Sequence, residues 1–75
     1  MKGTISSLLI NKNYGFIIGE NGQSYFFHRE DLNSNWNQLC VDWVDSAIKK
    51  IDVSFEAKST PKGPRAGNVN LIQNV

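Results

Sequence analysis

Four flat side chains occur within the first 28 residues at a spacing that would place them side by side. Tyr14 and Phe16 are separated by one residue, as are Phe26 and His28. Alternate residues of a β-strand point to the same face, so each pair would share one face of a strand. Rings gathered on an exposed sheet face form a surface on which unpaired nucleic-acid bases stack. With Lys12 at the rim, the pattern predicts a binding surface for single-stranded nucleic acid.

The two pairs are joined by a sequence that is typical of a β-hairpin. Asn21-Gly22 lies between them, and Asn-Gly flanked by alternating apolar residues is the strongest short-range signal for a hairpin. Folding of this hairpin would bring all four rings onto one surface.

The same residues resemble the paired nucleic-acid-binding motifs of the cold-shock domain. Those motifs correspond here to Lys12-Asn13-Tyr14-Gly15-Phe16-Ile17 and Phe26-Phe27-His28. Three further segments resemble the family in the right order: Met1-Lys2-Gly3-Thr4-Ile5, Val53-Ser54-Phe55-Glu56 and Lys62-Gly63-Pro64-Arg65-Ala66-Gly67-Asn68-Val69. The resemblance implies an all-β fold, a five-stranded antiparallel barrel of the OB type, in one domain over residues 1–75. It also implies binding of single-stranded RNA and DNA.

Strands are expected over residues 2–10, 14–19, 23–29, 51–58 and 65–73. The segment 59–64 is expected to be a loop, because two prolines and a glycine do not sustain a strand ladder. The residues predicted to line the barrel interior are Ile5, Ile17, Tyr25, Phe27, Val53, Phe55, Val69 and Leu71.

A helix is predicted between the third and fourth strands, over about residues 35–50. Its apolar residues recur with helical spacing: Trp36, Leu39, Cys40, Trp43, Val44, Ala47 and Ile48. Ser34 or Asn35 would cap its start, and Lys49-Lys50 suits the negative end of its dipole. The cold-shock family usually has a shorter, irregular connection here, whereas other OB folds often have a helix. We expect the helix to close one end of the barrel, remote from the binding face.

Two alternatives remain open for the tryptophans of this helix. Trp36 and Trp43 would mark a surface for a partner protein or an exchanged dimer. Alternatively, Trp36 would reach the binding face.

Positive charge is concentrated near the end of the sequence. Residues 57–75 hold Lys58, Lys62 and Arg65 and no acidic residue, within a chain whose formal net charge is +1. Together with Lys12 these residues would form a small basic rim, for which solvated loop lysines are the alternative interpretation. Lys62 and Arg65 are the better candidates for phosphate or base-edge contacts, and Lys58 is a further one. A rim this small implies weak salt dependence.

The sequence departs from the family in the first strand and after the histidine. Ser7 stands where the family has a stacking tryptophan, and Ser6 stands where it has a lysine. Loss of one stacking ring lowers affinity by ~1 to 3 kcal/mol, so weaker binding is expected. Asn13 replaces a glycine and tolerates a left-handed turn. Arg29 replaces an aromatic residue and supplies a planar, charged group that also stacks.

Other functional classes find little support. His28 has no accompanying nucleophile, paired carboxylate or second histidine, so no enzyme is expected. The single cysteine, Cys40, rules out an internal disulfide and a cysteine-rich zinc site, and no metal or cofactor is expected. No apolar run approaches the ~20 residues of a membrane span, and no signal peptide opens the sequence, so a cytoplasmic location is expected.

Two hypotheses follow. The first is a binder of single-stranded RNA or DNA that acts as a nucleic-acid chaperone. Its site would comprise Lys12, Tyr14, Phe16, Phe26, His28, Arg29, Lys62 and Arg65. The second is a degenerate cold-shock fold that binds protein, or dimerises, through the aromatic face or the Trp36/Trp43 helix. Exchange of strands between two copies is a further possibility for a chain with a long connection between strands.

Overall fold

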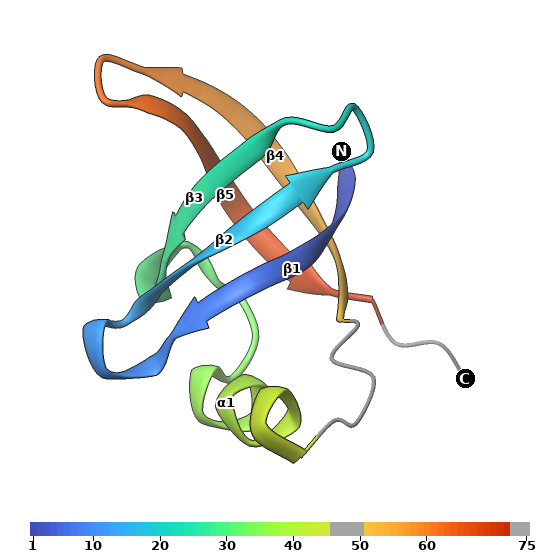
Figure 1. Cartoon of the computed structure of the whole chain (residues 1–75), viewed down its shortest axis with the longest axis vertical. Helices are drawn as coiled ribbons and strands as arrows, with labels where there is room; N and C mark the ends of the chain where they lie inside the picture. The colour runs from blue at the N-terminus through green and yellow to red at the C-terminus, as the bar shows by residue number, and fades with distance from the viewer. Residues whose placement is uncertain (46–50, 73–75) are drawn as a thin grey trace.

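A computed structural model of the chain describes residues 1–45 and 51–72, and shows a closed β-barrel with one α-helix at its end (Figure 1). The strands are β1 (Lys2–Leu9), β2 (Tyr14–Gly19), β3 (Ser24–His28), β4 (Asp52–Thr60) and β5 (Gly63–Leu71). The helix α1 spans Trp36–Asp45, and two 3₁₀ turns, η1 (Ile10–Lys12) and η2 (Arg29–Asp31), follow β1 and β3. The predicted all-β fold and the helix between the third and fourth strands are confirmed.

The barrel closes in the order β1-β2-β3-β5-β4. Four of the neighbouring pairs are antiparallel, as predicted. The pair that closes the barrel, β3 with β5, is instead parallel. This follows from the chain path, because the segment after β3 crosses the end of the barrel before β4 and β5 form their own hairpin.

Alternation along the strands fills the barrel interior as the sequence predicts. Seven of the eight residues expected inside are buried: Ile5, Ile17, Tyr25, Phe27, Val53, Phe55 and Val69. Leu71, the eighth, is partly buried and packs against the same core. The core also includes Ala66 of β5 and Leu32, Trp36 and Leu39 from the segment between β3 and β4.

Two turns orient the hairpins that carry the aromatic residues. Asn13 ends η1 with φ 62°, the left-handed conformation that its sequence position predicts. Gly22, with φ 81°, closes the predicted β2–β3 hairpin. Gly15 allows β1 and β2 to approach, because a Cβ atom there would lie 2.7 Å from the Ser7 carbonyl oxygen.

The loop predicted over residues 59–64 is too long, because the structure has only a two-residue turn there. β4 continues to Thr60 and β5 begins at Gly63, so that the turn consists of Pro61 and Lys62. Gly63 has φ 119°, and the Thr60 hydroxyl donates to its carbonyl oxygen at 2.7 Å. Pro64 pairs with Ser59, which a proline tolerates because alternate pairs of an antiparallel ladder exchange no hydrogen bond.

Helix α1 lies across one open end of the barrel, as predicted (Figure 1). The Asn35 side chain accepts a hydrogen bond from the Gln38 N–H at 3.2 Å and so caps the helix. Trp36 and Leu39 are buried, and Cys40 and Trp43 are partly buried against the core. The part of the predicted helix after Asp45, which includes Ala47, Ile48, Lys49 and Lys50, lies outside the described residues.

One prediction and one alternative interpretation for this helix are wrong. The apolar spacing predicts Val44 on the buried stripe, but Val44 is 63% exposed. At ~100° per residue it lies about 80° around the helix from Trp36, at the edge of the buried face. Trp36 does not reach the binding face, since its ring packs on the core residue Phe27 with 6.4 Å between ring centroids.

Candidate nucleic-acid interface

Tyr14, Phe16, Phe26 and His28 lie together on the outer face of β2 and β3, and we call them the aromatic platform. Tyr14 pairs with His28 and Phe16 pairs with Phe26 across the two strands. Ring centroids are 5.3 Å apart for Tyr14–Phe26, 5.9 Å for Tyr14–Phe16 and 6.0 Å for Phe16–Phe26. All four side chains are half-buried. The four rings therefore share the predicted face, and three of them form a continuous apolar surface.

His28 is held in a defined orientation by the turn η2. Its Nδ1 accepts a hydrogen bond from the Glu30 N–H at 3.1 Å, while its own backbone N–H donates to Asp31 Oδ2 at 3.0 Å. Because Nδ1 is an acceptor here, the neutral ring carries its proton on Nε2. His28 can therefore offer a hydrogen-bond donor as well as a ring face.

Strand β5 brings Arg65 to the edge of the aromatic platform. Arg65 pairs with Phe26 across the parallel junction, and its guanidinium carbon lies 5.6 Å from the centre of the Phe26 ring. Asp31 Oδ2 accepts from Arg65 Nε at 3.1 Å and lies 3.0 Å from Nη2. The sequence analysis singled out Arg65 but missed Asp31, because no local pattern links two residues 34 positions apart.

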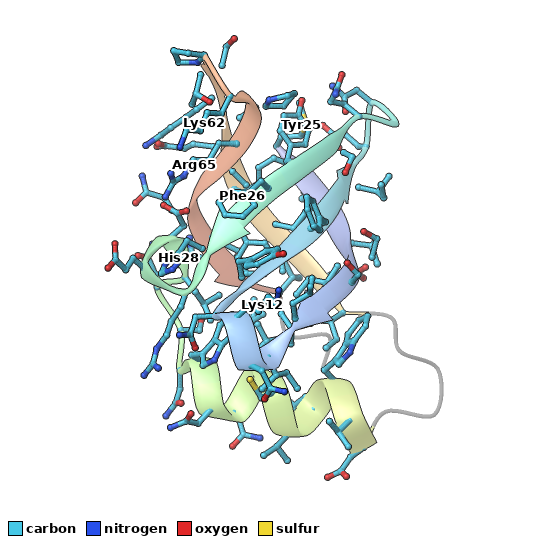
Figure 2. The ribbon with its side chains drawn as sticks, turned by 60° about the vertical axis from the view of Figure 1, so that its left-hand side comes forward. Lys12, Tyr25, Phe26, His28, Lys62 and Arg65 are labelled. Atoms are coloured by element: carbon cyan, nitrogen blue, oxygen red, sulfur yellow. The ribbon has the colours of Figure 1, made fainter. Side chains whose placement is uncertain are left out.

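A groove of about 680 Å³ runs beside the platform. One wall is formed by Phe16, Phe26 and His28, and the other by the tip of the β4–β5 hairpin, residues 60–65. Figure 2 shows Lys62 and Lys12 toward opposite ends of this face, with Phe26, Arg65 and His28 between them. The predicted basic rim is thus divided between two ends, and Lys62 is the lysine that lines the groove.

Two other basic residues do not line this groove. The Arg29 charge acts on Cys40 of α1: burial raises the pKa of the Cys40 thiol, and Arg29 partly offsets the increase. Arg29 thus lies within electrostatic reach of the helix, and it does not line the groove. The Lys58 side chain lies over Gly67: a Cβ atom added to Gly67 would be 2.7 Å from Lys58 Cε. Lys58 also lines a separate hollow with Gln23 and Tyr25.

The aromatic platform ends at Phe16 on the β1 side. Ser7 pairs with Phe16 and so shares its face, but carries no ring. The neighbouring Ser6 forms the bulge in β1, and its hydroxyl donates to the Phe16 carbonyl oxygen at 3.3 Å. The position that holds a tryptophan in the family is therefore correctly oriented here, but it is occupied by a hydroxymethyl group.

Residues 1–45 and 51–72 contain no cluster of three or more metal-ligating side chains. Within the same residues, no helix is long and apolar enough to cross a membrane.

Comparison with known proteins agrees with this geometry. The family model described as the 'Cold-shock' DNA-binding domain matches residues 1–72. This chain belongs to the cold-shock domain family. It is 31% identical over 67 residues to "Cold shock protein 1" of Lactiplantibacillus plantarum, an alignment that covers 89% of this chain and 91% of the relative. Membership of the family implies that the protein binds nucleic acid.

Proposed function

We propose that this protein binds single-stranded RNA or DNA by stacking unpaired bases on the aromatic platform, and so keeps those strands unpaired. One observation carries the proposal. Three rings in mutual contact lie half-buried on the outer face of a barrel whose interior is already filled by other side chains. An exposed apolar surface of this kind is typical of a binding site.

Stacking should supply most of the affinity. Each base stacked on an aromatic side chain contributes ~1 to 3 kcal/mol. Lys12, Lys62 and Arg65 lie along this face, and Arg65 is paired with Asp31. Two phosphate contacts by the lysines would give a slope of log K against log salt concentration of about −1.4 for a single strand. We therefore expect binding that persists at moderate salt.

The proposed action requires no catalytic step. A strand held by its bases is withdrawn from hairpins by mass action, because the protein binds the open form and not the paired one. This is the activity of a nucleic-acid chaperone, and we propose it in place of an enzymatic role.

Fluorescence anisotropy tests the proposal. A labelled oligothymidine and its oligouridine counterpart are titrated with the wild-type protein and with a Tyr14→Ala/Phe26→Ala variant. We expect micromolar binding by the wild type. Loss of two stacking rings should weaken it by ~2 to 6 kcal/mol, which is at least about 30-fold.

The matched control is Val44→Ala, which removes apolar area from the exposed side of α1, away from the platform. It should bind as the wild type does. Absence of binding at ~100 μM by the folded wild-type protein would reject the proposal.

The burial of Trp36 weakens the alternative hypothesis that the protein binds another protein through the Trp36/Trp43 helix. An interaction through Trp36 requires an exposed ring, but Trp36 is 6% exposed and belongs to the core. A strand-exchanged homodimer and a cytoplasmic location stay predictions.

A further inference from the structure

The guanidinium of Arg65 is fixed in place beside the aromatic platform. Asp31 Oδ2 accepts from Arg65 Nε, lies 3.0 Å from Nη2, and also accepts the His28 backbone N–H. The Asp31 side chain is 18% exposed, whereas that of Arg65 is 40% exposed. The carboxylate thus holds one edge of the guanidinium against the protein and leaves another edge facing outward.

The outward edge carries two parallel donors. A guanidinium has five N–H groups in a rigid plane, and the contact with Asp31 uses the edge formed by Nε and Nη2. The adjoining edge, formed by Nη1 and the second N–H of Nη2, has no hydrogen-bond partner among residues 1–45 and 51–72. The Arg65 guanidinium lies over the Phe26 ring in the same groove, so a base that enters the groove at this ring would meet this edge.

A neutral base suits this edge better than a phosphate. The Asp31 carboxylate largely compensates the charge of Arg65, and it would repel a phosphate drawn to the same place. A base edge carries no net charge and is not repelled. Lys62 lines the same groove, forms no ion pair among the described residues, and is the better phosphate partner.

The spacing of the donors selects among the bases. Two parallel N–H groups match two adjacent acceptors, which guanine presents at O6 and N7. Adenine places an amino donor beside N7, and the two carbonyl oxygens of thymine or uracil are separated by an N–H. Cytosine has adjacent acceptors at N3 and O2, but a purine covers more of the Phe26 ring and extends its edge further.

We propose that Arg65, positioned by Asp31, recognises guanine through O6 and N7 while the base stacks on Phe26. This inference rests on the proposed function, since it needs a base on the platform. It makes Arg65 a specificity-determining residue and Asp31 its positioning residue.

The test uses oligothymidines of about ten nucleotides, a length within the range bound by one OB fold. They carry one central guanine, inosine, 7-deazaguanine, adenine or cytosine, and all-thymidine serves as reference. For the wild type, guanine and inosine should each raise the affinity at least about five-fold, because both keep O6 and N7. Adenine and 7-deazaguanine should raise it much less, although both stack as purines.

Arg65→Lys keeps the positive charge and removes the two parallel N–H donors of the guanidinium. It should bind all-thymidine nearly as the wild type does, with the same salt slope, and lose the preference for guanine. Lys62→Met is the matched control: it should weaken binding to every oligonucleotide equally and make the salt slope about 0.7 shallower.

Asp31→Asn tests the positioning role, since asparagine can still accept the His28 N–H. It should reduce the guanine preference and steepen the salt slope, because the freed Arg65 charge becomes available to phosphates. Circular dichroism melting verifies that each variant is folded. A merely structural role for Asp31 would leave both the base preference and the salt slope of the folded variant unchanged.

The outcomes separate the two proposals. If all-thymidine is not bound, the proposed function fails. If all-thymidine is bound and guanine brings no gain, or cytosine brings a larger one, only the guanine inference fails. A guanine preference that survives in Arg65→Lys, or is lost equally in Lys62→Met, also overturns it.

Discussion

The aromatic platform and helix α1 both carry aromatic side chains a few residues apart, and they use them in opposite ways. Tyr14, Phe16 and Phe26 lie half-buried on the outer face of the sheet, whereas Trp36 is 6% exposed and packs on Phe27 inside it. The two sets thus lie on opposite sides of the same sheet. The comparison teaches that the surroundings of an aromatic residue, and not its type, separate a binding role from a structural one.

Replacement of Trp36 should have the largest effect, and on stability alone. Trp36→Ala removes a buried ring and is expected to lower the free energy of unfolding by ~3 to 5 kcal/mol, measured by urea denaturation. Trp36→Leu fills part of the space, should lose less, and provides a folded protein for titration. Its affinity for oligothymidine should stay within about two-fold of the wild type. A folded Trp36→Leu that binds as poorly as Tyr14→Ala/Phe26→Ala would show that the two regions are not separable.

Addition of a ring to the platform should have the next largest effect, and on binding alone. Ser7 pairs with Phe16 and shares its face, so Ser7→Trp extends the aromatic platform across β1. We expect tighter binding to oligothymidine by up to ~1 to 3 kcal/mol, measured by anisotropy. Ser7→Val adds apolar area without a ring and serves as the control. Equal gains in both variants would mean that burial, and not stacking, sets the affinity at this edge.

The smallest expected effect concerns Cys40, which packs against the core from the α1 side. Burial raises the pKa of its thiol in the folded protein, with Arg29 as an opposing influence. The folded state therefore holds the proton more tightly than the unfolded state, and the resulting stability is present at neutral pH and lost as the pH rises. Between about pH 8 and pH 10 the wild type should lose slightly more unfolding free energy than Cys40→Ala. Denaturation curves at the two pH values measure this loss of unfolding free energy. An equal loss in both proteins would show that the Cys40 thiol does not contribute to the pH dependence.

Local sequence patterns predict the parts of the structure that depend on local geometry. The alternation in β2 and β3, with Asn21-Gly22 between them, fixes which rings share the outer face. Helical spacing likewise predicts that Trp36 and Leu39 face the core, and the side-chain oxygen of Asn35 caps the helix as expected. In each case the interacting residues are close in sequence.

Predictions fail where the outcome depends on contacts between distant segments or on the margin of a pattern. The pairing of β3 with β5, which sets Arg65 beside Phe26 and Asp31, cannot be derived from either segment alone. The strands of the β4–β5 hairpin extend through Thr60 and Gly63 because their ladder tolerates Pro64, which composition alone does not reveal. Val44 is exposed because it lies at the edge of the helical stripe.

The junction between β3 and β5 has a consequence for the lifetime of a complex. Its strands are joined by one pair, Phe26 with Arg65, and the isolated bridge Leu32–Val69 lies beyond it. Local unfolding starts where few contacts hold the backbone, so we expect the barrel to open first at this junction. A base stacked on Phe26 and held by Arg65 would touch both strands and act as a non-covalent cross-link. Backbone amides of both strands should then exchange hydrogen more slowly in the complex. The bound base would thus stabilise the closed barrel as well as occupy the binding site.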